Sequence, residues 1–320
     1  MNRLLALAAL ALVICTAAVH AQGYPGKPVR MSVGYPPGGS IDVVARLLST
    51  QFSSSMGQQF IVENRTGAAG TISAQQVATA PPDGYTLLIG AAAQISSAPS
   101  NFKKLPYDPQ RDLTPIMLIA HQPNILIVHP SVPVRNAKEF IARVKANPGK
   151  FTYGSSGIGA TQHMSAELFA MMTGAKITHV PYRGGAPAMI DLLSGQIDFI
   201  FSVVPTAVPY IKNGKVRPIA LTSMKRIESL PDVPTLHESG VKGFDFSGWI
   251  GILGPANLPR DIVTQLHTQA QKAVTGPLRP RLVDLGLGIA AGTPEEFAAF
   301  IKEDTGKIAK IVKAANIPPQ

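Results

Sequence analysis

A strand that runs through a short glycine-rich turn into a helix limits the folds that this chain can adopt. Residues 29–34 form an apolar run typical of a buried strand, and apolar residues recur at helical spacing over residues 41–52. The turn between them is Tyr35-Pro36-Pro37-Gly38-Gly39-Ser40, in which Ser40 is a favourable helix N-cap. Its glycines allow close approach to the backbone, and the unpaired N–H groups of a first helical turn attract an anion. An ordinary strand–helix connection has the same pattern, so this motif alone does not establish a binding site.

The rest of the first half alternates strands with helices. Strands are predicted at 59–63 and 85–90, with a helix from about Thr71 between them. This alternation predicts a parallel sheet covered by helices, in which a ligand binds at the carboxyl ends of the strands. The loops that should converge there are rich in Gly, Ala, Ser and Gln and span residues 36–40, 66–71 and 91–96. They offer backbone donors rather than reactive side chains.

A second turn, over residues 153–163, repeats the logic of the first. A short strand leads into Gly154-Ser155-Ser156-Gly157 and then into a helix that stops at Gly174. A nucleophile elbow is excluded because Gly157 directly follows Ser156, and a P-loop is excluded because no Gly-Lys-Ser/Thr follows. Arg183 follows the next apolar strand, where it fits either a bidentate contact to a ligand carboxylate or, as we favour, a hydrogen bond between loops.

Two apolar strands, 116–120 and 125–129, are separated by Gln122-Pro123, where we expect the chain to cross into a second lobe. An apolar strand at 246–254 should return it, and the helices that follow should clasp the first lobe. The predicted fold is therefore α/β, a two-lobed clamshell in which each lobe is a mostly parallel sheet flanked by helices, with two hinge crossovers. Lobe one is expected to comprise residues 22–122 and 247–320, and lobe two residues 123–246.

The ends of the chain and its composition exclude several classes of protein. Residues 1–21 read as a secretory signal peptide with cleavage after Ala21, which would remove Cys15, the only cysteine. The formal net charge is +10, but Lys and Arg are scattered, which argues against a nucleic-acid partner. Neither paired carboxylates nor a histidine pair at metal-binding spacing stands out, so we expect no catalytic residue, metal or cofactor. His163, in the first turn of its helix, is expected to be structural more readily than to support the cleft loops.

The motifs in order resemble the Bug-type periplasmic solute-binding receptors of tripartite tricarboxylate transporters, and the match covers essentially the whole mature chain. The motifs are Pro37-Gly38-Gly39-x-x-Asp42-x-x-Ala45-Arg46, Val62-Glu63-Asn64-Arg65-x-Gly67-Ala68-x-Gly70, Pro82-Asp83-Gly84-Tyr85-Thr86-Leu87, Gly154-Ser155-Ser156-Gly157-x-Gly159 with His163, and Val180-Pro181-Tyr182-Arg183-Gly184. The resemblance implies a Venus-flytrap binding protein of the periplasm, without catalytic activity, that captures a small carboxylate and delivers it to membrane permease subunits.

The resemblance also implies which residues hold the ligand. One carboxylate would lie between the loop of lobe one and the turn of lobe two, partly through bridging waters. The implied contacts are Pro37, Gly38, Gly39, Ser40, Gly70 and Thr71 from lobe one and Ser155, Ser156, Ala160 and Thr161 from lobe two. Tyr35, which stands where the family more often has Phe and adds a hydroxyl near the mouth, and Arg183 are further candidates. Gln94, in the loop 91–97, and Ser202, at a strand end, are expected to select the rest of the ligand.

Two other functions use the same residues differently. The closed protein, expected to be a monomer, would signal to a sensor kinase instead of supplying a permease. Alternatively, Ser156 would be the nucleophile of a secreted serine hydrolase, although no elbow and no His–Asp partner are evident. The sequence does not indicate which small organic acid is bound.

Overall fold

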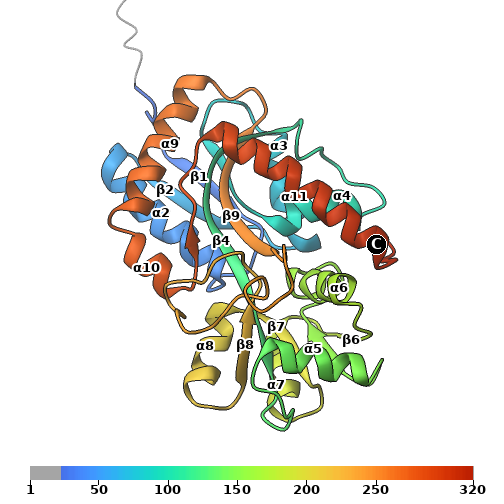
Figure 1. Cartoon of the computed structure of the whole chain (residues 1–320). Helices are drawn as coiled ribbons and strands as arrows, with labels where there is room; N and C mark the ends of the chain where they lie inside the picture. The colour runs from blue at the N-terminus through green and yellow to red at the C-terminus, as the bar shows by residue number, and fades with distance from the viewer. Residues whose placement is uncertain (1–22, 320) are drawn as a thin grey trace, which may run out of the picture.

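The computed structural model describes residues 23–319 as two lobes, with β4 (Leu113–Val128) passing through both and β9 (Ser247–Pro255) beside it (Figure 1). The other strands are β1 (Val29–Val33), β2 (Phe60–Asn64), β3 (Thr86–Ala91), β5 (Thr152–Ser155), β6 (Thr178–Pro181), β7 (Phe199–Val203), β8 (Arg217–Leu221) and β10 (Gly288–Ile289). The α-helices are α2 (Ser40–Met56), α3 (Thr71–Ala78), α4 (Ala98–Asn101), α5 (Ala137–Ala146), α6 (Thr161–Thr173), α7 (Gly185–Leu193), α8 (Val204–Lys212), α9 (Arg260–Thr275), α10 (Arg279–Asp284) and α11 (Pro294–Ala314).

The two lobes share one strand order. In lobe one β1 pairs in parallel with β2 and β3, and in lobe two β5 pairs in parallel with β6 and β7. These strands alternate with helices, which forces parallel pairing. Nearer the junction the pairing becomes antiparallel, between β3 and β9, β9 and β4, and β4 and β7. The predicted two-lobed α/β clamshell with two crossovers is confirmed.

The first crossover is one continuous strand, so the prediction of two strands separated at Gln122-Pro123 is wrong. Residues 113–123 of β4 pair with β9, and residues 124–128 pair with β7. Pro123 lies where the strand changes partners, so its missing N–H donor removes little from the ladder. One continuous strand therefore carries the chain through the junction.

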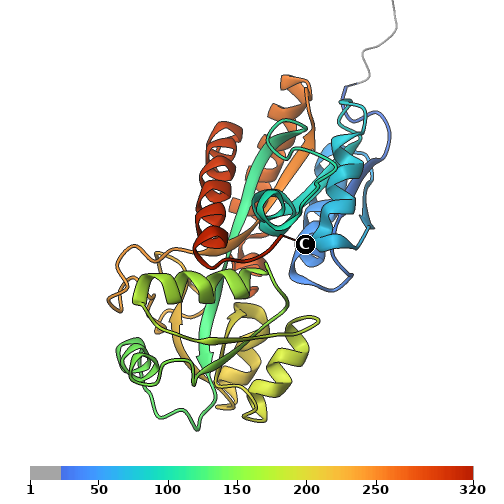
Figure 2. The same cartoon turned by 90° about the vertical axis from the view of Figure 1, so that its right-hand side faces the viewer.

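Helix α11 does not stay with lobe one as predicted. Phe297 and Ile301, near its start, pack with Trp249 in a lobe-one core, whereas Ile308, Ile311 and Val312 pack in the core of lobe two. Figure 2 shows the helix descending from the upper lobe toward the lower one. At 1.5 Å of rise per residue, a helix of 21 residues spans about 30 Å, enough to reach both cores.

Smaller differences concern three segments. The helix α8 was not predicted, because two prolines within it argue against a helix; one of them, Pro205, falls in the first turn, where proline is tolerated. The sequence also predicts a short helical piece from Pro231 to about Gly240, but these residues form turns. A π-helical turn (Ala93–Ser97) precedes α4. The predicted signal peptide lies outside the described residues. Among residues 23–319, no helix combines the length and apolar character needed to cross a membrane.

Candidate functional site

The first helix of lobe one begins differently from the prediction. Gly39 is the N-cap of α2, and Ser40 is the first helical residue, so the prediction of Ser40 as N-cap is wrong. The Ser40 hydroxyl instead accepts a hydrogen bond of 2.7 Å from the side-chain amide of Gln122, in the hinge strand β4. The first bond of the helix runs from Val43 N–H to the Gly39 carbonyl. The N–H groups of Ser40 and the next two residues are therefore left free by the helix itself.

Asp42 holds the loop that precedes this helix. Its buried carboxylate accepts hydrogen bonds from Gly38 N–H (2.9 Å), from the Arg46 guanidinium (2.9 and 3.0 Å) and from the Asn64 amide (2.7 Å). Burial alone would raise the pKa of Asp42, but these hydrogen bonds and the charge of Arg46 outweigh it and hold the pKa below its usual value. The Gly38 N–H is consequently occupied, and Arg46 balances the negative charge beside the free donors.

Two of the three predicted loops of lobe one, 66–71 and 91–96, meet beside Gly34 and Tyr35, which directly precede the third. A Cβ added to Gly34, at the end of β1, would lie 2.6 Å from the Gly70 Cα, and a Cβ on Gly70 would collide with the Gln94 side-chain oxygen. The ring of Tyr35 lies 3.4 Å from the same Gly70 position. Gln94 is fully buried, and neither atom of its amide has a hydrogen-bond partner among the described residues. Since an unpaired buried amide is costly, Gln94 calls for a water or ligand group at this point.

The turn of lobe two uses most of its own donors. Ser156 N–H donates to the Gln162 side chain (2.6 Å), Gly157 N–H to the Ser155 hydroxyl (3.1 Å) and Gly159 N–H to His163 Nδ1 (3.0 Å). Helix α6 has Ala160 as its N-cap, and its first bond runs from Met164 N–H to the Ala160 carbonyl. The donors left free are therefore the N–H groups of residues 161–163, again the first turn of a helix.

A stack of aromatic rings packs against this turn. The imidazoles of His163 and His179 lie parallel with centroids 4.2 Å apart, and Tyr153 stacks on His179 at 4.7 Å. The Tyr153 hydroxyl donates to Glu167 (2.6 Å), and the Ser155 hydroxyl lies 2.7 Å from His179 Nε2. Burial lowers the pKa of both histidines to about 4, with His179 adding to the effect on His163. Both histidines are therefore neutral at pH 7, and their ring nitrogens hydrogen-bond to residues of the turn.

The two helix starts meet at one point of the hinge. Gln122 and Gly248 are cross-strand partners in the β4–β9 ladder, so their side-chain positions share a face. Ser40 contacts Gln122 on that face, and the Thr161 methyl group would lie 3.5 Å from a Cβ added to Gly248. Asn101 of lobe one also abuts Gly159, where an added Cβ would lie 2.5 Å from its amide nitrogen. Free N–H donors from both lobes thus lie beside the same cross-strand pair of the hinge, Gln122 and Gly248.

Other predicted residues lie around this centre or away from it. Thr71 donates its hydroxyl to the Ala68 carbonyl. Arg183 is exposed before α7 and has no hydrogen bond or ion pair with a described residue. Ser202 pairs with Ile125, whereas Val203 pairs with Asn124 on the face of Gln122, so the Ser202 side chain lies on the other face of the sheet. Pro37 and Gly39 are exposed.

Gln122 and Asn101 were not predicted as site residues. Nothing in the sequence marked Asn101, and Gln122 was noted only as a break between strands. The contact from Gln122 to Ser40 joins positions 82 residues apart. Among the described residues, no group of three His, Cys, Asp or Glu side chains is placed to bind a metal ion.

Comparison with known proteins places this geometry in a family. Residues 44–317 match the family model described as the tripartite tricarboxylate transporter family receptor. The protein BugT of Bordetella pertussis is 32% identical over 98% of this chain and 98% of its own length. Two solved structures from Rhodopseudomonas palustris are also similar. Rpa4515 with adipate is 35% identical, covers 93% of this chain and 100% of its own, and has a TM-score of 0.81. MatC with bound malate is 31% identical, covers 90% and 100%, and has a TM-score of 0.76. The chain therefore belongs to the tripartite tricarboxylate transporter receptor family, as its motifs predicted.

Proposed function

We propose that the protein is a periplasmic receptor that captures a small carboxylate between its lobes and supplies it to the permease of a tripartite transporter. The observation that carries this proposal is the pair of helix starts, α2 and α6, whose free N–H groups flank the hinge at Gln122 and Gly248. Such donors suit a carboxylate, and charge-assisted hydrogen bonds are stronger than neutral ones. Two similar structures carry dicarboxylates, adipate and malate, which supports the same ligand class here.

The proposed site residues fall into three sets: direct donors, residues that shape or support the site, and residues that act through water or only on closure. The N–H groups of residues 40–42 and 161–163, with the hydroxyls of Ser40, Ser156 and Thr161, hold one carboxylate. Pro37, Gly38, Gly39 and Ala160 shape the turns, Tyr35 and Gly70 form a wall, and Ser155 fixes the second turn through His179. Gln94 acts through a bridging water, and Arg183 at the start of α7 reaches the ligand only in the closed state.

Binding and closure are one event in this proposal. Residues 22–122 with 247–320 move against residues 123–246 about the β4–β9 junction, and α11, anchored in both cores, bends or shifts with them. The ligand favours closure only through contacts that it gains there, from donors of both lobes. We propose a monomer, because both donor sets come from one chain, exported by a signal peptide cleaved after Ala21. Ser156 has no histidine partner among the described residues, so the hydrolase reading has no support.

A thermal-shift experiment tests the ligand class. The mature protein, refolded to remove carried-over ligand, is heated with adipate or malate and, as a matched neutral control, with adipamide. A ligand at about 100 times its dissociation constant adds about 2.7 kcal/mol of stability, a shift of about 5 °C or more. We expect a shift with at least one carboxylate and none with adipamide. An equal shift with the neutral diamide would refute a carboxylate site. So would the absence of a shift with every mono-, di- and tricarboxylate tested. Loss of uptake on deletion of the permease genes separates transport from signalling to a sensor kinase.

A further inference from the structure

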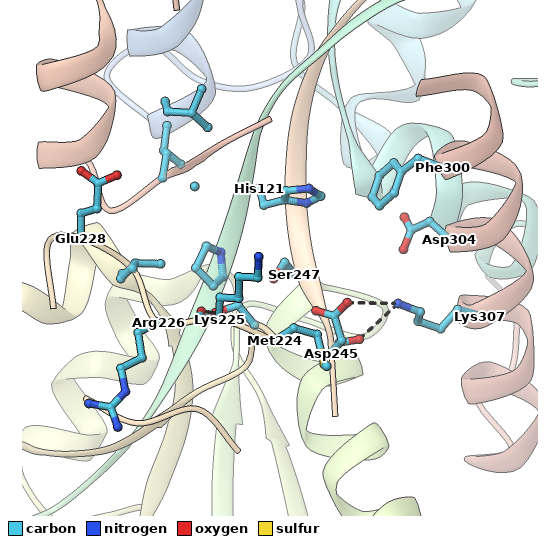
Figure 3. A pocket seen from close by; sticks show the side chains of 16 residues that line it. His121, Met224, Lys225, Arg226, Glu228, Asp245, Ser247, Phe300, Asp304 and Lys307 are labelled. Carbon is cyan, nitrogen blue, oxygen red and sulfur yellow. Dashed lines mark hydrogen bonds and ion pairs between the residues drawn. The ribbon is translucent and has the colours of Figure 1, made fainter. Parts of the chain in front are cut away.

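A cavity of about 530 Å³ lies behind the hinge (Figure 3). His121, Pro123 and Ser247 line it, whereas Gln122, between the first two in β4, points to Ser40 on the other side. Side chains of a strand alternate between its two faces, so this cavity and the free helix donors lie on opposite faces of the same ladder. We call it the hinge cavity.

The walls of the hinge cavity come from both lobes. One wall is formed by residues 287–289 with β10 and by Phe300, Asp304 and Lys307 of α11. The facing wall is the loop 223–228 that follows β8. Figure 3 shows Asp304 and Phe300 on one side and Glu228 and Arg226 on the other. The width of this space must therefore depend on the angle between the lobes.

Most charges around the hinge cavity are already paired. Lys307 donates to the Asp245 carbonyl (3.2 Å) and lies 4.0 Å from its carboxylate. Glu228 pairs with Arg279 (2.6 Å), and Arg226 pairs with Glu238 (2.9 Å) and points away from the cavity in Figure 3. Asp304 is buried and accepts a hydrogen bond from the Trp249 indole (2.9 Å), and burial raises its pKa.

One cation in the hinge cavity has no partner. The Lys225 ammonium makes no ion pair or hydrogen bond with any residue from 23 to 319, and Figure 3 draws it reaching into the cavity. The remaining surface is apolar or neutral: Met224, Ile289 and Phe300, with the His121 imidazole edge-on to the Phe300 ring at 5.3 Å. Burial lowers the pKa of His121, so it carries no charge at pH 7. Six of the lining residues are charged, but Lys225 is the one cation among them without a partner, and it lies beside an apolar wall. A polar anchor beside apolar surface is typical of small-molecule sites of this volume.

We propose that the hinge cavity binds a small apolar monocarboxylate, with the carboxylate on Lys225 and the hydrocarbon part against Phe300 and Ile289, and that this ligand favours closure of the lobes. The second half rests on the hinge motion of the proposed function. A rotation that brings the starts of α2 and α6 together moves the walls of the hinge cavity apart, because these lie on the opposite face of the hinge. Opening must narrow the cavity again. An occupant resists that narrowing, so it stabilises the closed form and strengthens binding at the front.

Binding at the hinge cavity is tested with 4-fluorobenzoate, followed by ¹⁹F NMR on the mature chain. Lys225→Met should weaken binding at least tenfold, while Lys272→Met, which removes another exposed lysine, on α9 and outside the cavity lining, should leave it unchanged. Thr161→Pro, which removes a donor of the front site, should also leave it unchanged. Loss in Thr161→Pro with retention in Lys225→Met would mean that the probe sits in the front site and would overturn the proposal. Tighter binding of 4-fluorobenzylamine than of 4-fluorobenzoate would assign the cavity to cations through Asp304 and overturn it equally.

The coupling is tested separately by titration calorimetry with the dicarboxylate that gives the larger thermal shift. Saturating 4-fluorobenzoate should tighten its binding about threefold or more in the natural sequence and not in Lys225→Met. Unchanged or weaker binding would refute the coupling. If no dicarboxylate binds at all, the proposed front site fails, but binding of 4-fluorobenzoate that depends on Lys225 would still support the hinge cavity.

Discussion

The two turns at the hinge solve one problem with different chemistry. In each lobe the third residue of the helix folds back and accepts the N–H of the glycine four positions earlier, Asp42 from Gly38 and His163 from Gly159. Both glycines have positive φ, +83° and +79°. Lobe one uses a carboxylate and must then neutralise it with Arg46, whereas lobe two uses an imidazole that burial keeps neutral.

This difference shows what the turns have in common. A turn that presents free helix donors to an anion needs an acceptor for its own glycine N–H, yet a bare negative charge there would repel the ligand. Lobe one removes the charge by pairing, and lobe two avoids it. The lobes should therefore be equivalent in binding but not in their response to acid or to loss of charge.

The largest expected effect tests the equivalence in binding. Ser40 and Thr161 are each the first helical residue, where proline is tolerated, and the residues before them are extended, with ψ of 161° and 157°. Ser40→Pro and Thr161→Pro each remove one donor, and since a hydrogen bond to a charged group contributes about 1.5–3 kcal/mol, affinity should fall roughly 10- to 100-fold. Calorimetry with the identified ligand measures this, with Ser40→Ala and Thr161→Ala as controls that remove only the hydroxyl.

The two lobes are not equivalent in binding if one proline variant binds the ligand normally while the other does not. That result would assign the carboxylate to a single lobe. Melting temperatures within a few degrees of the natural sequence would show that the helices still form.

The second-largest expected effect is a difference between the two turns in how acid changes the free energy of unfolding. The pKa of His163 and His179 is about 4 in the folded protein and about 6.5 when unfolded. Between these values the unfolded chain binds more protons, so stability falls as the pH drops from 6.5 toward 4. We expect a loss on the order of 2 kcal/mol from pH 7 to pH 4.5, less than the full linkage value because His179 is only half-buried. The pKa of Asp42 is lowered, so its contribution is lost only below about pH 3.8.

Urea unfolding at pH 7 and pH 4.5 checks this prediction with a matched variant. Asparagine at position 163 can still accept the Gly159 N–H but does not titrate. The stability cost of His163→Asn should therefore shrink at pH 4.5, whereas the cost of Asp42→Asn should stay constant. A cost of His163→Asn that is equal at both pH values would mean that the imidazole is solvated and exchanges protons freely.

The sequence predicts the turns well and their partners poorly. Strand, glycine turn and helix follow from local periodicity, and even the contacts from Asp42 to Gly38 and from His163 to Gly159 span only four residues. The sequence does not show that Asp42 and His163 accept these particular N–H groups, because every residue except proline carries a backbone N–H. Gln122 was missed because its contact to Ser40 depends on the continuous hinge strand. The span of α11 across both lobes was missed because its apolar stripe does not say which core it enters.

The smallest expected effect isolates the charge of lobe one. Asp42→Asn keeps an acceptor for the Gly38 N–H but loses the ion pair with Arg46, whose side chain is 53% exposed. We expect a stability loss of about 1 to 2 kcal/mol, because water partly screens the ion pair, whereas the new amide NH2 can no longer accept the hydrogen bond from the Asn64 amide. Ligand affinity should change less than about threefold: the variant removes a negative charge, but that charge is already balanced by Arg46 in the natural sequence. Arg46→Gln, the matched partner variant, leaves Asp42 uncompensated beside the donors and should weaken anion binding, most clearly at low salt. Equal affinity in both variants at low salt would show that the carboxylate is too well hydrogen-bonded for its charge to reach the ligand, and the need for neutralisation in lobe one would no longer explain Arg46.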